Sequence, residues 1–197
     1  RVMKVYYDSG IRNKGKGLPG FPQKVNWQFE HAGLKRYIHT IYHFSKGMVF
    51  YIITILDEAR LREYFDKYES PESRTTQLER RCAKQEHPYR DVLIFKLQIN
   101  DEPVESSYSS SHYTYMPWTR NDDSDCMEAM LKKYSSVLKG ASCFACERFY
   151  IPYPETDSKL EKLRRFLRFY KVKHMKFSTF PVQFLYPLDI HFEMSEY

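Results

Sequence analysis

The sequence is poor in cysteine and has no long apolar run. Its 197 residues contain four cysteines, too few for a disulfide-dense scaffold, which a chain of this size does not need. The longest largely apolar run, Met48 to Leu56, has nine residues, whereas a helix needs about 20 to cross a bilayer. These absences exclude a disulfide-stapled scaffold and a helical membrane span, and we expect no membrane partner.

The sequence also lacks an Asn-x-Ser/Thr glycosylation acceptor. Together with the few cysteines, this predicts an intracellular protein, nuclear or cytoplasmic, whose thiols are reduced. A hydrophobic content of 42% is enough for one ordinary core. Because residue 1 is Arg rather than Met, we expect residues 1–197 to form a single domain that is excised from a larger protein.

No catalytic motif is complete. Gly10 to Lys16 matches the GxxxxGK pattern of a nucleotide-binding loop, but Gly17 stands where a magnesium-binding Ser or Thr is required. Pro19 and Pro22 then prevent the helical turn that would hold a phosphate. A GxSxG serine is absent too. We therefore predict a non-catalytic protein, with a metal-dependent or phosphate-transforming enzyme as an alternative, since acids and bases can converge in space alone.

What the sequence does contain is positive charge and aromatic side chains. Lys and Arg number 31 against 25 Asp and Glu, a net charge of +6, and aromatic residues make up 17% of the chain. The charge favours an anionic partner. Tyrosine serves equally in cores, protein interfaces and base stacking, so the aromatic excess alone does not decide between these uses.

Periodicity predicts an α+β fold in which an antiparallel sheet built from hairpins is covered by three or four helices. The firmest element is a hairpin of 35–44 and 48–56, joined by Ser45, Lys46 and Gly47. Alternating or apolar stretches predict the other strands, and Asp91 to Ile99, apolar on both faces, should be central. These other strands are 2–7, 24–30, 91–99, an edge strand before Trp118, 176–180, 182–186 and 188–194.

Four amphipathic stretches predict the helices. The first follows Asp57 and the second spans 74–86. The third runs from the caps at 121–125 to Leu138, and the fourth follows Ser158. Apolar residues at helical spacing should form the inner face of each helix. In the last helix this inner face comprises Leu160, Leu163, Phe166, Leu167 and Tyr170.

The remaining face of the last helix is strongly basic, which predicts binding of RNA or single-stranded DNA. In this hypothesis cations contact phosphates, the glycine- and proline-rich loop closes over the strand, and a tyrosine stacks on a base. The residues assigned to this site are Arg12, Lys14 and Lys16 of the loop, with Tyr153, Lys162, Arg164, Arg165, Arg168, Tyr170, Lys171 and Lys173.

Two other interpretations of these features stay open. The basic face could meet an acidic protein surface, or the tyrosine surplus could form the centre of a protein interface. The second predicts a large exposed apolar and aromatic patch.

A metal site is suggested by Cys143 and Cys146, whose spacing is that of half a zinc site, with Cys126 as a further ligand. No second close pair completes it, so zinc is an alternative to a protein without a cofactor. His39 and His43 would share one face of a strand. The acids of 121–125 are explained by helix capping.

Overall fold

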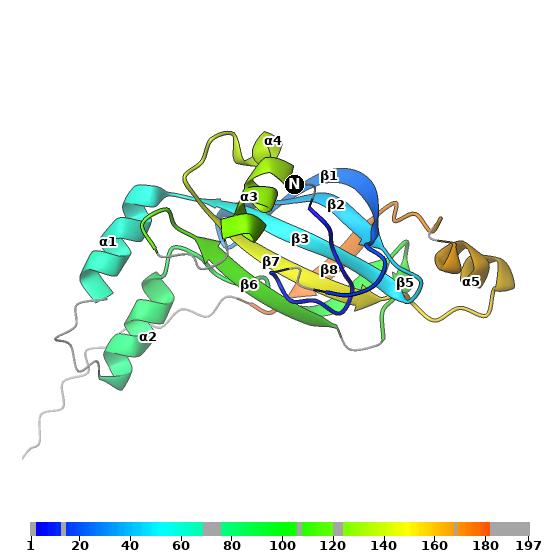
Figure 1. Cartoon of the computed structure of the whole chain (residues 1–197). Coiled ribbons are helices and arrows are strands. Elements are labelled where there is room, and N and C mark those ends of the chain that lie inside the picture. The colour runs from blue at the N-terminus through cyan, green and yellow to red at the C-terminus, as the bar shows by residue number, and fades with distance from the viewer. Residues whose placement is uncertain are drawn as a thin grey trace, which may run out of the picture.

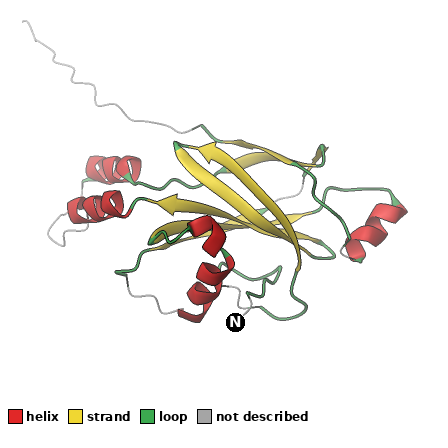
Figure 2. Ribbon diagram, turned by 90° about the horizontal axis from the view of Figure 1, so that it is seen from above, coloured by secondary structure: helices red, strands yellow, loops and turns green. Residues whose placement is uncertain are grey.

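The computed structural model describes residues 3–12, 15–68, 76–105, 108–119, 124–167 and 169–181. Two antiparallel sheets lie face to face, and the described helices lie at the two ends of the sheets and over one face (Figures 1 and 2). This confirms the predicted α+β class. The predicted strands at 182–186 and 188–194 lie outside the described residues.

The larger sheet, sheet A, has five strands in the order β1-β2-β3-β7-β6. The predicted hairpin is confirmed, because β2 and β3 pair directly and their link contains Ser45 and Lys46. The serine- and tyrosine-rich strand lies at an edge, as expected. The bounds are β1 Phe21–His31, β2 Leu34–His43, β3 Gly47–Leu56, β6 Ser109–Tyr115 and β7 Cys143–Pro152.

The smaller sheet, sheet B, has three strands in the order β5-β4-β8. The predicted strand at 91–99 forms β4, the middle strand of this sheet. Its expected burial on both faces is wrong, because Leu93 and Phe95 are exposed and only the face toward sheet A packs in the core. The bounds are β4 Ile94–Ile99, β5 Glu102–Pro103 and β8 Met175–Thr179.

Strand β7 was not predicted, although it is buried along most of its length between β3 and β6. Two charged residues in its middle, Glu147 and Arg148, conceal its apolar character. Both are buried and paired with distant segments: Arg148 donates to the carbonyls of Tyr6 and Tyr7 at 2.6 and 3.0 Å. Glu147 accepts from the backbone N–H of Val92 and from the hydroxyl of Tyr89, with the guanidinium of Arg36 3.8 Å away.

The described helices largely match the predicted positions, but one helix face and one predicted strand need correction. Leu78 and Cys82, the expected inner face of α2, are exposed. Residues 3–7 form no strand; instead Val5 inserts into the core as part of an irregular segment. The bounds are α1 Glu58–Tyr68, α2 Gln77–Glu86, α3 Ser124–Lys133, α4 Ser135–Leu138 and α5 Lys159–Phe166.

The two faces of sheet A bury different clusters. One face packs against sheet B, in a cluster that joins Phe50 and Phe149 of sheet A to Ile99 of β4. The other packs against α3, α4 and the N-terminal segment, with Tyr51 and Met130 at its centre. Each helix in the described part of the chain is too short or too polar to span a membrane.

Candidate interaction surface

Helix α5 lies at one end of the molecule, opposite to α1 and α2, and projects beyond the sheets (Figures 1 and 2). It begins after Ser158, whose hydroxyl accepts the backbone N–H of Glu161 at 3.3 Å. This confirms the Ser158 half of the expected capping box with Glu161. The other half does not form, because the backbone N–H of Ser158 donates to the hydroxyl of Thr156. Glu161 itself pairs with Arg165, 3.2 Å away and one turn further along the helix.

The faces of α5 are inverted relative to the sequence prediction. Among its eight residues, all of which the structure describes, only Arg165 is buried. Leu163 is 52% exposed and Phe166 is 70% exposed, whereas Arg165 is 7% exposed. The expected inner face is therefore wrong for these positions. We call the outward set the α5 apolar face: Leu160, Leu163, Phe166, Leu167 and Phe169.

Arg165 fixes the helix to the body of the protein. Its guanidinium lies over the rings of Tyr153 and Tyr170, 5.2 and 5.1 Å from their centroids. It donates to the carbonyl of Pro154 and lies 3.7 Å from a carboxylate oxygen of Glu102. A planar, delocalised cation is well suited to stacking on rings while it donates in its own plane.

The two tyrosines rest on a buried hydrogen-bond network. Imidazole nitrogen Nδ1 of His43 lies 2.8 Å from the hydroxyl of Tyr153, and Nε2 lies 2.8 Å from Oε1 of Gln23. Burial lowers the pKa of His43 to about 4, so the ring is neutral at pH 7. With Nε2–H donating to Gln23, Nδ1 accepts the Tyr153 hydroxyl proton. Burial also raises the pKa of both tyrosines, so both hydroxyls keep their protons.

The residues predicted to bind nucleic acid fall into three groups. Arg165, Tyr153 and Tyr170 are buried and contact one another, so in this structure they offer no surface to a phosphate or a base. Lys14 and Arg168 lie outside the described residues. The nucleic-acid prediction now depends on the exposed cations, which are Arg12, Lys16, Lys162, Arg164, Lys171 and Lys173.

The N-terminal segment that leads into the basic loop and the tyrosines that hold α5 pack on opposite faces of sheet A. Val5, with Met3 and Ile11 around it, packs on the face of sheet A that carries α3 and α4. Tyr153 and Tyr170 belong to the cluster on the opposite face, between the sheets.

The predicted metal pair is not assembled. Cys143 and Cys146 are three residues apart on the extended strand β7, so their side chains leave opposite faces: Cys146 packs near α3, whereas Cys143 packs near α1. They cannot grip one zinc ion, which overturns that interpretation. The side chain of Cys126 is outside the described part. Within the described residues, no group of three or more His, Cys, Asp or Glu side chains could hold a metal ion.

His39 and His43 were also expected on one face, and this expectation is wrong. The register of β2 against β3 shifts between Tyr37 and Ile41, which turns the strand between the two histidines. The ring of His39 packs edge-on against Tyr134 of the α3 side, whereas His43 lies between the sheets beside Tyr153. A β-bulge of this kind leaves no clear sequence signal.

The α5 apolar face is the feature that the sequence prediction missed. The helical periodicity predicted an apolar face and a basic face of α5, but it did not show which face packs against the rest of the protein. Comparison of the chain with protein-family models, curated proteins and solved structures finds no match.

Proposed function

We propose that this chain is a protein-interaction module that binds its partner through the α5 apolar face. The observation that carries the proposal is the inversion of α5, with Arg165 inside and large leucine and phenylalanine side chains outside. Exposed apolar patches of this kind are typical of interaction sites.

The spacing of the exposed side chains fits a helix that lies in a groove of its partner. Leu160, Leu163 and Leu167 follow one another at i, i+3 and i+7, the pattern of anchors in this binding mode. The anchoring of α5 by Arg165 means that the helix does not have to be ordered on binding, which lowers the entropic cost.

The charges around the face indicate the chemistry of the partner. Exposed Lys159, Lys162 and Arg164 flank the apolar anchors. The one acid of α5, Glu161, already pairs with Arg165. We therefore propose a partner with an apolar groove and an acidic rim, since complementary charge steers association and rejects other surfaces.

A photo-crosslinking experiment tests this proposal. Phe166 is replaced by benzoylphenylalanine and the full chain is irradiated in the cells that produce it. We expect a discrete protein adduct whose crosslinked peptide maps to an apolar concave site rimmed by Asp or Glu. Leu163→Asp should abolish the adduct, and Lys162→Glu with Arg164→Glu should weaken it.

Leu78→Asp is the matched control, because Leu78 is also an exposed leucine but lies on α2, at the other end of the molecule. It should leave the adduct unchanged. A variant Leu163→Asp that keeps the adduct, or a Phe166 position that yields none, contradicts the proposal.

Nucleic-acid binding is a second candidate, because the exposed rings of Phe166 and Phe169 lie among exposed cations. Rings for stacking beside cations for phosphates are what single-stranded binding uses. Anisotropy of fluorescein-labelled oligo(U) and oligo(dT) distinguishes the two candidates. Nucleic-acid binding predicts affinity that falls steeply with salt and is lost on Arg164→Glu with Lys162→Glu, while Leu163→Asp has little effect.

A further inference from the structure

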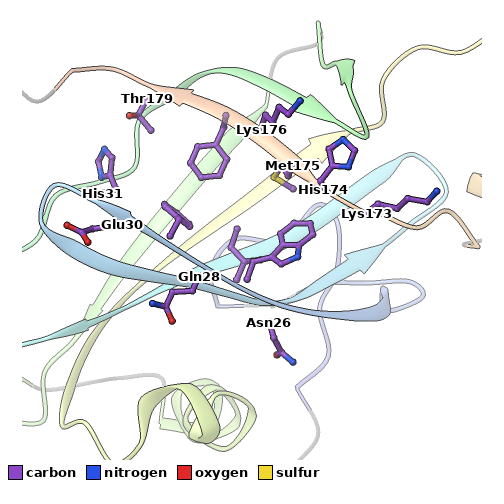
Figure 3. A pocket seen from close by; sticks show the side chains of 13 residues that line it. Asn26, Gln28, Glu30, His31, Lys173, His174, Met175, Lys176 and Thr179 are labelled. Atoms are coloured by element: carbon purple, nitrogen blue, oxygen red, sulfur yellow. The ribbon is translucent and has the colours of Figure 1, made fainter.

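A groove of about 760 Å³ runs between β1 and β8 (Figure 3). Its floor consists of buried and half-buried apolar side chains from both sheets, continuous with the core. The ring centroids of Phe29 and Phe177 meet there at 5.0 Å. Floor residues are Trp27, Phe29, Ile38, Met175 and Phe177.

Both walls of the groove are edge strands. β1 is the outermost strand of sheet A and β8 is the outermost strand of sheet B. Within the described residues, neither strand pairs with a second neighbour. An edge strand presents N–H and C=O groups at alternate residues, and these groups can pair with an added strand.

At one end of the groove, a side chain of β1 already pairs with backbone groups as an added strand would. The side-chain amide of Gln23 donates to the carbonyl of Val172 at 2.7 Å and accepts its N–H at 3.0 Å. This one amide thus satisfies both backbone groups of Val172, as a neighbouring strand would. Beyond it, Asn26 has a φ of 52° and the register shifts between Lys24 and Trp27. The regular, open part of the β1 edge is therefore Trp27 to His31.

The two ends of the groove carry opposite charges. Figure 3 shows Glu30 at one end and Lys173 at the other. His174 and Lys176 are engaged by Asp101, each at 2.8 Å. Among the described residues, neither Glu30 nor Lys173 forms a direct ion pair. Glu30 leaves the face of β1 that turns away from the floor, and Lys35 is its neighbour across β2. A ligand with one basic and one acidic end would complement this arrangement.

We infer that the groove binds an extended segment of another protein, which adds as a strand antiparallel to Trp27–His31 of β1. Five residues of strand span roughly 16 Å. Alternate apolar side chains of the segment enter the floor. A basic residue near its N-terminus, on the face of the segment that turns away from the floor, meets Glu30, and an acidic residue near its C-terminus meets Lys173.

Three observations favour a peptide over other occupants. The open backbone edge offers hydrogen bonds that only another backbone can satisfy in sequence. The charges of Glu30 and Lys173 at the two ends set the direction of the segment. A nucleic-acid strand would require more cations than the groove has, since one of its two lysines, Lys176, is held by Asp101.

The test uses the full chain and a fluorescein-labelled peptide, Thr-Lys-Val-Thr-Phe-Thr-Ile-Asp, in anisotropy titrations. Two further peptides carry N-methyl groups on alternate residues, one peptide at its odd positions and the other at its even positions. N-methylation removes the donor from one edge of the peptide, so one phase should weaken binding by at least about tenfold while the other has little effect. Hydrogen exchange should slow at Trp27–His31 and stay unchanged at the β6 edge.

Charge exchange gives a matched control. Lys173→Glu should weaken binding about fivefold, and a peptide ending in Lys instead of Asp should restore it. Lys171→Glu, an exposed position outside the groove, should have no effect. Equal affinity for both N-methylated peptides, no binding at millimolar peptide, or displacement of the peptide by oligo(U) overturns the inference. Leu163→Asp should leave peptide binding intact, so failure here is separable from failure of the α5 proposal.

Discussion

The guanidinium of Arg165 lies 5.2 Å from the ring centroid of Tyr153, and this contact decides which face of α5 reaches the solvent. The ring of Tyr170 lies on the same cation at 5.1 Å. Once Arg165 points inward, a periodicity of 3.6 residues per turn forces Leu163 and Phe166 outward. A single cation thus fixes the position of the proposed interaction surface.

Arg165→Ala should destabilise the protein by roughly 3 kcal/mol, since it removes bonds to the Pro154 carbonyl and Glu161 and the stacking on two rings. Arg164→Ala, its exposed neighbour, should change the unfolding free energy by less than about 0.5 kcal/mol. Urea denaturation of both variants measures this difference. Equal effects would contradict the role assigned to Arg165.

The structural features that depend only on residues close together in the sequence were predicted correctly. The β2–β3 hairpin and the cap at Ser158 follow from local alternation and from a residue type at one position. Strand β7 could not be predicted, because the partners that make a buried Glu147 tolerable come from β2 and from the segment around Tyr89. The orientation of α5 was hidden for the same reason, since the rings that receive Arg165 lie outside the helix.

Gly47→Ala should destabilise the protein by about 1–3 kcal/mol through overpacking. A Cβ at this position would lie 2.3 Å from the carbonyl oxygen of Ile151 and 2.6 Å from the hydroxyl of Tyr7. The φ of Gly47 is not positive, so its backbone conformation does not require glycine. Glycine is required here because of this close packing. Gly10→Ala is the control, because nothing lies within 4 Å of a Cβ there. Thermal unfolding should separate the two variants by several degrees, and equal midpoints would contradict this packing argument.

The cysteines should differ in reactivity. Cys82 is exposed, whereas Cys143 and Cys146 are buried, and burial raises the pKa of Cys143. A thiol reacts as its thiolate, so both buried thiols should be inert in the native state. In a Cys126→Ser background, maleimide labelling should modify one thiol before unfolding and three after it. Rapid native labelling of Cys146, or stoichiometric zinc lost on Cys146→Ser, would contradict the burial of the pair on opposite faces.

Stability should fall as the pH drops from about 7 to 4, because of His43. Its pKa is lowered from 6.5 to about 4 in the folded protein by burial, so the unfolded chain binds more protons in this range and acid favours unfolding. The shift corresponds to about 3 kcal/mol. His43→Leu leaves the Tyr153 hydroxyl without its acceptor and should be less stable at pH 7. Its deficit relative to the natural chain should shrink by about that amount at pH 4, in urea titrations at each pH. A His43→Leu deficit that stays constant with pH would show that this imidazole is already charged, or already exposed, in the native protein.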